Sequence, residues 1–176
     1  MKNVRIIAFM RIGLISDTHG YLDERLIMHL NAVDEIWHAG DIGTIDLLQK
    51  LEEMKPLVSV YGNIDGKEIR AASKEYEIIE RDGIKFLMIH IAGSLPKYNP
   101  RVRELIKEYQ PKFLICGHSH ILKIKPDPVN ALIYMNPGAA GNHGFHKVKT
   151  MLRFDINNGE LKNLEVVEFG KRGQLK

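Results

Sequence analysis

Cysteine is almost absent from this chain of 176 residues, in which Cys116 is the single thiol. One cysteine cannot form a disulfide within the chain, so the sequence is unlike the small secreted domains that depend on disulfides and favours the reducing cytoplasm. The lack of further thiolate ligands also argues against a purely structural zinc site. We interpret Cys116 itself as a small buried hydrophobic residue rather than as a nucleophile.

Long apolar runs and blocks of like charge are missing as well. No stretch approaches the roughly 20 apolar residues of a membrane-spanning helix, so we expect no membrane attachment. The net charge of +3 is small, and no cluster of basic residues resembles a nucleic-acid-binding arm, so we expect a small substrate rather than a nucleic acid. The sequence leaves a homodimer or a higher homo-oligomer open.

The length of the chain favours one domain. A chain of 176 residues can bury a sizeable core but does not suffice for two comfortable domains. Residues 1–9 resemble a signal peptide only loosely, because Arg11 interrupts the apolar run and no small-residue cleavage site follows. We therefore divide the chain into an N-terminal extension (residues 1–9), a single domain (10–170) and a tail (171–176).

The spacing of apolar residues predicts an α/β domain. Its first part has the β-α-β-α-β order that builds a mostly parallel sheet. Two later pairs of apolar runs are separated by turn sequences and predict hairpins. We expect an α/β/β/α sandwich, in which two packed mixed β-sheets are flanked by helices. The predicted strands are residues 11–15, 35–38, 57–61, 76–80, 84–90, 113–116, 132–135, 148–156 and 161–169, and the predicted helices are 22–31, 44–54 and 101–109.

Residues with metal-binding side chains follow five of the predicted strands. Open α/β sheets build their sites at the carboxyl ends of strands, so we expect these side chains to meet at one edge. Carboxylates and imidazoles are costly to bury together without a compensating partner. The residues are Asp17 and His19 in SDTHG, Asp41 in HAGDIG, Asn63 in YGNIDG, His90 in LMIHIAG, and His118 and His120 in GHSH.

Two divalent cations would compensate this set of side chains. Carboxylate, amide and imidazole ligands suit Mn²⁺, Fe²⁺, Zn²⁺, Ni²⁺ and similar ions. In an extended strand, residues i and i+2 point the same way about 6.6 Å apart. We therefore expect Asp17 and His19 to converge on one ion, and His118 and His120 to serve one ion each of a pair.

The ordered motifs D-x-H, GD, GN, H and GHSH resemble the calcineurin-like metallophosphoesterase superfamily, and most closely its small bacterial and archaeal phosphodiesterases. The resemblance extends from Met10 to about Phe169. It implies a cytoplasmic, metal-dependent phosphodiesterase with two divalent ions, Mn²⁺ foremost and Ni²⁺, Fe²⁺, Zn²⁺ or Mg²⁺ as alternatives. It also implies that a hydroxide bridging the ions attacks phosphorus in line with the leaving oxygen.

The resemblance also assigns ligands to each ion. Asp41 would bridge the two ions, and Asp41, Asn63 and His118 would take part directly in catalysis. The first ion would be held by Asp17, His19, Asp41 and His120, and the second by Asp41, Asn63, His90 and His118.

Three positions depart from the superfamily pattern. Ile64 follows Asn63 where many members have a histidine that protonates the leaving oxygen or contacts phosphate. Ile91 follows His90 where many members have glycine, and NPGAAG (residues 136–141) replaces the commoner NPGS. The isoleucine at position 64 predicts slow hydrolysis of esters with poor leaving groups.

The remaining polar residues are interpreted mainly as structural or exposed. His29 lies within a predicted helix, and His38 is left open as a support for a ligand. Asp65 either orients the Asn63 loop or belongs to a turn. His143 and His146 are expected in a solvated loop, with the mouth of the site as the alternative. Lys123, Lys125, Lys147 and Lys149 alternate along strands and are expected on a solvent face, with phosphate steering as the alternative.

Two other functions stay open. A phosphomonoesterase or nucleotidase would differ only in its leaving-group machinery, whereas a Vps29-like protein-binding scaffold would share the fold without catalysis. All seven ligand residue types are in place. This favours the enzyme, because a scaffold is under no constraint to keep them.

Overall fold

The computed structural model describes residues 9–173. Its first strand begins at Met10, so the predicted extension (residues 1–9) lies, apart from Phe9, outside the described residues. Residues 174–176 of the predicted tail lie outside them as well. No helix in the described part is long and apolar enough to cross a membrane.

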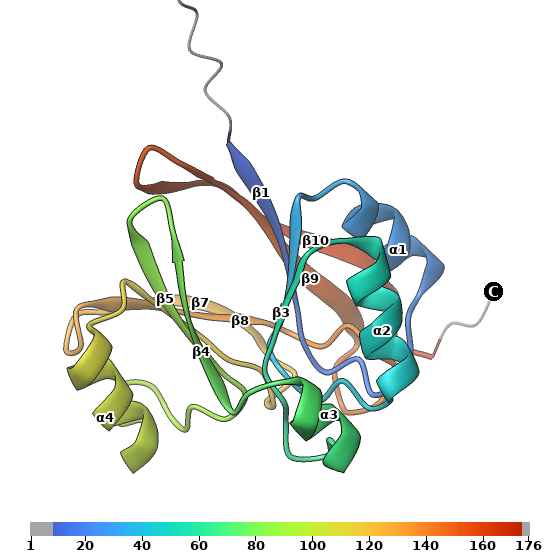
Figure 1. The fold of residues 1–176 in the computed structure, drawn as a ribbon, viewed down its shortest axis with the longest axis horizontal. Helices are drawn as coiled ribbons and strands as arrows, with labels where there is room; N and C mark the ends of the chain where they lie inside the picture. The colour runs from blue at the N-terminus through green and yellow to red at the C-terminus, as the bar shows by residue number, and fades with distance from the viewer. Residues whose placement is uncertain (1–8, 174–176) are drawn as a thin grey trace, which may run out of the picture.

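One sheet contains the three strands that open the domain. Strands β1 (Met10–Ile15), β2 (Glu35–His38) and β3 (Leu57–Ser59) run in parallel. The closing hairpin, β9 (Val148–Asn157) and β10 (Glu160–Lys171), joins the other edge, with β9 antiparallel to β1. The strand order is β10-β9-β1-β2-β3, so the first strand of the chain pairs with β9 of the closing hairpin, and Figure 1 shows both ends of the chain in this sheet.

The second sheet is built from the middle of the chain. Strands β4 (Tyr76–Arg81) and β5 (Ile84–Ile89) form the predicted hairpin, and β6 (Phe113–Ile115) pairs with β5 in parallel. Strands β7 (Leu122–Asp127) and β8 (Leu132–Pro137) complete the order β4-β5-β6-β8-β7. Both sheets therefore mix parallel and antiparallel pairs, as predicted.

Helices cover the outer face of each sheet (Figure 1). Helices α1 (Glu24–Asn31) and α2 (Ile45–Met54) pack on the first sheet, and α4 (Pro100–Tyr109) packs on the second. These three helices begin after Asp23, Thr44 and Asn99, whose side chains accept a hydrogen bond from the first turn. The short α3 (Lys67–Ala72) has no counterpart among the predicted helices. It follows Gly66, which makes no side-chain cap, so the usual start signal is missing.

The main core lies between the two sheets. Trp37 of the first sheet packs edge-on against Phe86 of the second, with ring centroids 4.8 Å apart, and lies 5.7 Å from Phe154. Each sheet also has one further apolar cluster between its outer face and the helices that cover it. The layers are helix, sheet, sheet, helix, so the predicted α/β/β/α sandwich is confirmed.

Lys149 contradicts the prediction that its side chain lies on a solvent face. It is fully buried, and its Nζ donates to Asp23 Oδ2 at 2.5 Å and to Asn142 Oδ1 at 3.3 Å. Strand β9 is paired on both edges and buried along most of its length. Both of its faces are therefore covered, and the alternation of lysines at its start does not indicate a face exposed to solvent. The other lysines of that set are exposed, as expected: Lys123, Lys125 and Lys147.

Candidate metal centre

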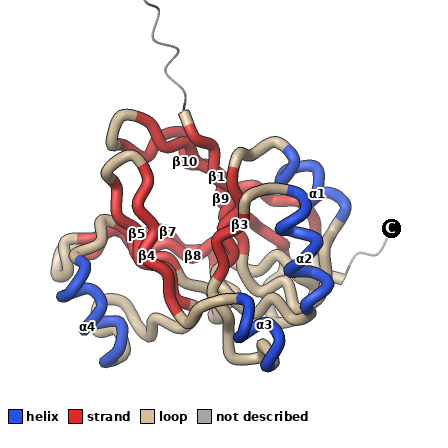
Figure 2. The backbone as a smooth tube through the Cα atoms, in the orientation of Figure 1, coloured by secondary structure: helices blue, strands red, loops and turns tan. Residues whose placement is uncertain are grey.

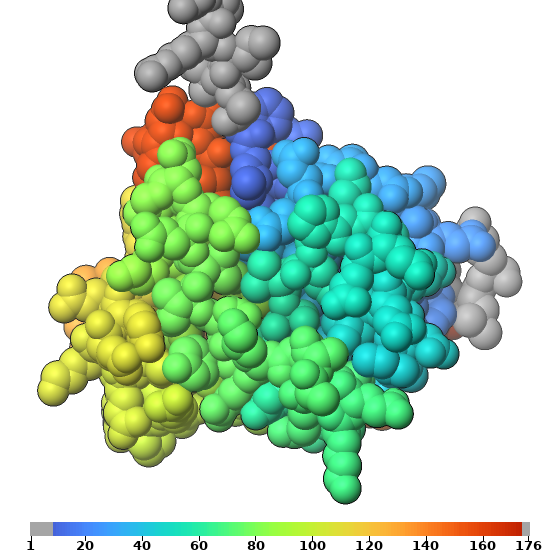
Figure 3. All heavy atoms as spheres, in the orientation of Figure 1, coloured from blue at the N-terminus to red at the C-terminus, as the bar shows by residue number. Residues whose placement is uncertain are grey.

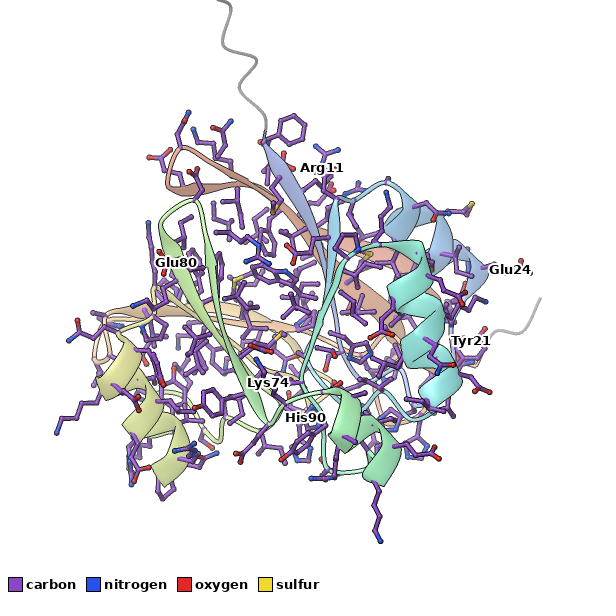
Figure 4. The ribbon with its side chains drawn as sticks, in the orientation of Figure 1. Arg11, Tyr21, Glu24, Lys74, Glu80 and His90 are labelled. Atoms are coloured by element: carbon purple, nitrogen blue, oxygen red, sulfur yellow. The ribbon has the colours of Figure 1, made fainter. Side chains whose placement is uncertain are left out.

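The predicted ligands gather at the carboxyl ends of the strands. They follow β1, β2, β3, β5 and β6, and Figure 2 shows loops crowding this end of the sheets. Figure 4 places His90 at the same end of β5. Two groups of three side chains there have their ligand atoms within 4.8 Å of one another: Asp17, His19 and His120, and Asp41, His90 and His118.

The first cluster (Asp17, His19 and His120) joins two loops that are far apart in the sequence. His120 Nε2 lies 3.1 Å from Asp17 Oδ1 and 3.4 Å from His19 Nε2. The carboxylate is buried and the two imidazoles are half-buried. The backbone N–H of His118 donates to Asp17 Oδ2 at 3.1 Å, which fixes the carboxylate at the bottom of the site.

The second cluster (Asp41, His90 and His118) is more open. His90 Nε2 lies 3.2 Å from Asp41 Oδ1 and 3.2 Å from Asn63 Oδ1. The rings of His90 and His118 meet edge to face with their centroids 5.3 Å apart. Asp41 and His90 are buried, whereas Asn63 and His118 are exposed. A ligand that approaches from solvent therefore meets Asn63 and His118 first.

Asp41 lies between the two clusters. Its Oδ1 faces His90 at 3.2 Å, and its Oδ2 faces His19 at 3.8 Å. Only 2% of the residue is exposed. One oxygen is thus directed toward each cluster, which is the arrangement that a bridging carboxylate requires.

The backbone of the ligand loops is not the extended chain that we predicted. Strands β1 and β6 end at Ile15 and Ile115, before the ligands. Left-handed φ angles are uncommon outside glycine, although Asp and His adopt them more readily than most residues. Each costs on the order of 1–3 kcal/mol and persists only where the surroundings enforce it. The residues concerned are Asp17 (56°), His19 (50°), Asp41 (55°), His118 (67°) and His120 (58°).

Two glycines that precede ligands allow the loops to approach each other. A Cβ added to Gly62 would lie 2.0 Å from Asp41 Oδ1, and one added to Gly117 would lie 2.8 Å from Asp17 Oδ2. No side chain fits at such distances. The glycines of the GN and GH motifs are therefore required because side chains of other loops occupy the space: Asp41 beside Gly62, and Ser16 (Oγ at 1.9 Å) and Asp17 beside Gly117.

Hydrogen bonds also orient the ligands of the second cluster. His90 Nδ1 lies 2.8 Å from the carbonyl oxygen of Ala39. As the donor to this carbonyl, Nδ1 carries the proton, and Nε2 keeps its lone pair for an ion. The N–H of Ile64 donates to Asp41 Oδ1 at 3.1 Å.

His38 joins the loops of the two clusters from below. Its Nδ1 accepts a hydrogen bond from the N–H of Gly40 at 3.2 Å, so Nε2 carries the proton and donates to Thr18 Oγ1 at 2.8 Å. Thr18 Oγ1 in turn donates to the carbonyl oxygen of Ile42 at 3.0 Å. Burial lowers the pKa of His38 to about 4. The neutral imidazole supports the ligand loops and does not itself face the centre.

Asp65 orients the Asn63 loop, the first of its two predicted alternatives. Its carboxylate accepts hydrogen bonds from the N–H groups of Gly62 at 2.7 Å, Gly43 at 2.8 Å and Ile42 at 3.2 Å. These bonds hold the loop after β3 against the loop after β2.

Burial and ion pairing oppose each other at Asp41 and His90. Burial raises the pKa of the Asp41 carboxyl, but its hydrogen bonds with His90 and the N–H of Ile64 hold the pKa below its usual value. Burial lowers the pKa of His90, but the hydrogen bond with Asp41 and the charges of Asp41 and Asp17 outweigh burial. The pKa of His90 therefore lies above its usual value. At His19 burial dominates and lowers the pKa despite both carboxylates.

The donor set fits two divalent cations. Within residues 9–173, the ion-pair partners of Asp17 and Asp41 are histidines, and no lysine or arginine neutralises either carboxylate. Oxygen and imidazole donors of this kind match the preferences of Mn²⁺, Fe²⁺, Zn²⁺ and Ni²⁺. Two divalent ions would supply the missing positive charge and leave the imidazoles neutral.

The loop between β8 and β9 also reaches the first cluster. The ring of His143 lies 4.9 Å from that of His19, and the ring of His146 lies 5.5 Å from that of His120. Both rings therefore border the first cluster, which is the alternative that the sequence left open, while the His143 side chain is itself exposed to solvent. The loop connects strands of different sheets, so its approach depends on how the sheets pack.

A cavity of about 370 Å³ opens beside the second cluster and is lined in part by Asn63 and His90. Arg70 and Arg101 line it as well, and no motif of the sequence marks either arginine as a site residue. They belong to α3 and α4, which only the folded chain brings to one place.

A family model of the calcineurin-like phosphoesterase superfamily domain matches residues 10–159. The chain belongs to this superfamily. The predicted resemblance is confirmed, and membership supports a metal-dependent hydrolase that acts on phosphoesters.

Two curated relatives come from Methanocaldococcus jannaschii. The probable metallophosphoesterase MJ0623 is 33% identical over 136 residues, which cover 74% of this chain and 68% of the relative. The phosphodiesterase MJ0936 is 25% identical over 146 residues, which cover 73% of this chain and 83% of the relative. The name of the second relative gives diester hydrolysis for a distant member of the superfamily.

A solved structure of the same fold is that of Vps29 from Entamoeba histolytica complexed with Zn²⁺. It superimposes with a TM-score of 0.70 at 19% identity and covers 92% of this chain and 100% of that chain. Identity this low shows the fold alone.

Proposed function

We propose that this chain hydrolyses small phosphodiesters at a dinuclear metal centre, with Mn²⁺ as the first ion to test. The observation that carries the proposal is the pair of ligand clusters with Asp41 between them. A single ion could be coordinated by only one of the two clusters, and the ligands of the other cluster would bind nothing. The diester preference is supported by the distant phosphodiesterase MJ0936.

The proposed ligands follow the superfamily pattern. A bound pair of divalent ions supplies Lewis acidity for the phosphoryl oxygens and lowers the pKa of the attacking water. His90 presents Nε2 because Nδ1 donates to Ala39, and Asn63 and His118 stand exposed at the mouth, where a phosphate group arrives. Asp17, His19, Asp41 and His120 would hold one ion, and Asp41, Asn63, His90 and His118 the other.

The position after Asn63 limits the range of leaving groups. Ile64 is 46% exposed at the mouth and can neither donate a proton nor form a hydrogen bond through its side chain. A positioned acid typically accelerates departure of a poor leaving group by about 10²–10⁴-fold. We therefore expect a preference for activated aryl diesters over alkyl monoesters. A phosphomonoesterase, which would need such an acid for its usual substrates, is the second candidate function.

The proposed location is the cytoplasm, because a chain with a single cysteine forms no internal disulfide and suits a reducing compartment. Cys116 is buried, and burial raises the pKa of its thiol to about 12. A thiol of this kind is unreactive, which agrees with its interpretation as a small core residue.

Metal loading and turnover must be measured together to test the proposal. The protein is stripped of metal, reconstituted with Mn²⁺, and assayed with bis(p-nitrophenyl) phosphate and with p-nitrophenyl phosphate. We expect two ions per chain by elemental analysis and faster turnover of the diester. Two bound ions without any turnover would favour the scaffold, and faster turnover of the monoester would favour the phosphomonoesterase.

A further inference from the structure

The cavity beside the second cluster lies to one side of the centre. It reaches the ligands through Asn63 and His90, and no residue of the first cluster lines it in the described part of the chain. One wall comes from the β3–α3 region and the other from the β5–α4 region. In Figure 3 the segments of α3 and α4 are separate masses, with residues of the β4–β5 hairpin between them.

One wall of the cavity presents flat surfaces. The guanidinium of Arg70 lies over the ring of Tyr61 at 4.3 Å. It is held there by hydrogen bonds to the carbonyl oxygens of Asp65 at 2.7 Å and Gly62 at 2.9 Å. These bonds fix the guanidinium plane against the loop that carries Asn63, so the wall is ordered before a ligand arrives.

The opposite wall combines an apolar side chain with a second guanidinium. Ile91, directly after His90, is 38% exposed and lines the cavity. Arg101 lines it from the start of α4 and lies over the ring of Tyr76 at 5.1 Å. Glu75 also lines the cavity and offsets one of the two positive charges, so a strongly anionic group is not favoured.

We infer that this cavity binds a flat aromatic group, an aryl ring or a nucleobase, on the ester arm that remains attached to phosphorus. The inference rests on the proposed diesterase function. Guanidinium planes and an isoleucine side chain provide stacking and apolar contact without a fixed charge pattern. The volume of about 370 Å³ is at the lower end of small-molecule sites, which suits one ring system rather than a polymer.

The geometry of displacement assigns the cavity to the retained arm. The attacking and leaving oxygens lie on opposite sides of phosphorus in an in-line reaction. The remaining substituents project sideways from that axis. A cavity beside one cluster, rather than across from both, is placed to receive such a substituent.

Three diesters with the same leaving group test the inference. Methyl p-nitrophenyl phosphate, phenyl p-nitrophenyl phosphate and thymidine 5′-(p-nitrophenyl phosphate) release the same p-nitrophenolate but differ in the retained arm. For each protein, the ratio of kcat/KM for an aromatic arm to that for the methyl arm is measured. Arg101→Ala and Ile91→Ser should lower this ratio roughly 5- to 20-fold.

Matched controls separate the cavity from general surface effects. Arg103 is exposed on the same helix and does not line the cavity, and Ile121 also follows a ligand histidine but lies outside it. Arg103→Ala and Ile121→Ser should leave the ratio unchanged. If Ile91→Ser loses metal by elemental analysis, Arg101→Ala still decides the result, because Arg101 is on α4 and adjoins no ligand.

Binding of a product analogue gives a second readout. Calorimetric titration of the Mn²⁺-reconstituted protein should show tighter binding of thymidine 5′-monophosphate than of methyl phosphate, and Arg101→Ala should remove most of that difference. Equal ratios and equal affinities in the wild type and both cavity variants would overturn the inference while leaving diester hydrolysis intact. No turnover of any of the three diesters by the wild type would instead refute the proposed function.

Discussion

The two ligand clusters differ in what surrounds them. The first is bordered by the β8–β9 loop, where His143 and His146 lie against its imidazoles. Buried Lys149 anchors the end of this loop. The second opens onto the cavity that Ile91 and Arg101 line. Similar ligand types thus lie in one enclosed and one open setting. The comparison indicates that the ligand types decide which ions can bind, whereas the neighbouring loops decide from which side a substrate reaches them.

Asp41 is shared by both clusters, so its replacement should give the largest effect. Asp41→Asn keeps the shape of the side chain but removes the charge. We expect loss of both ions and a fall in diester kcat/KM of more than about 100-fold, the upper end of the loss seen when a residue merely supports a ligand. Elemental analysis and steady-state kinetics provide the measurement. Asp46→Asn, on the exposed side of α2, is the control.

The difference between the clusters predicts different single-ligand variants. His19→Ala should weaken mainly the first ion, and His90→Ala mainly the second. Retention of two ions by Asp41→Asn, or loss of both by His19→Ala alone, would contradict the division into two clusters that share one carboxylate.

Lys149 tests whether the enclosed side depends on a buried ion pair. Lys149→Met removes one of the two cations that pair with Asp23, the other being Arg25. Because Asp23 stays buried and partly compensated, we expect the free energy of unfolding to fall by about 2–3 kcal/mol, below the 3–5 kcal/mol typical of a fully broken pair. Urea denaturation measures it. Lys147→Met, at an exposed position of the same region, should change stability by less than about 0.5 kcal/mol, and equal losses in the two variants would exclude a special role for the buried pair.

His38 links the loops of both clusters and should make stability depend on pH. Its pKa is about 4 in the folded protein, against an ordinary 6.5. Between these values the unfolded chain binds more protons, so stability falls as the pH drops from 6.5 toward 4. From this group we expect a loss of about 2 kcal/mol between pH 7.5 and pH 5.

The variant His38→Gln isolates this contribution. Urea denaturation of the metal-free protein at the two pH values should show a smaller difference for His38→Gln than for the wild type. His29→Gln, in α1, is the control and should retain the wild-type difference. An unchanged difference in His38→Gln would mean that other groups cause the acid sensitivity.

Ile64 and Ile121 each follow a ligand, one on the open side and one on the enclosed side, and give the smallest expected effect. Ile64→His should raise turnover of diesters with poor leaving groups about tenfold, less than a fully positioned acid provides, and should change activated aryl diesters little. Ile121→His should not do so. The measurement is the dependence of rate on the pKa of the leaving group. Equal slopes for the wild type and Ile64→His would show that another residue is the acid or that proton transfer does not limit the rate.

Much of the fold follows from local pattern. The predicted strand at residues 35–38 coincides with β2 (Glu35–His38), and the predicted hairpins at 76–90 and 148–169 form as β4–β5 and β9–β10. Their signals are local: apolar alternation and turn residues within a few positions. Helix α3 was missed because it is short and begins after a glycine that makes no side-chain cap. Strand β7 was missing from the predicted strands, although Lys123 and Lys125 were read as alternating along a strand.

The sequence by itself determined which side chains could bind metal. Their types, their order and their places after apolar runs are properties of the chain, and a strand that ends in a parallel sheet brings its next residues to the common edge. Convergence of Asp17 and Asp41 therefore followed from element order, because β1 and β2 are parallel neighbours in one sheet. His118 follows β6 of the other sheet, so it reaches them only because the two sheets pack face to face.

Only the tertiary structure decided how these residues are held and what surrounds them. The left-handed conformations at Asp17 and Asp41 persist because neighbouring loops supply hydrogen bonds and leave no other space. Lys149 is buried because Asp23, 126 positions away in sequence, supplies its counter-charge. Arg70 and Arg101 share a cavity because α3 and the start of α4 lie beside the same ligands, Asn63 and His90. Each of these facts depends on contacts between distant segments, which no local pattern records.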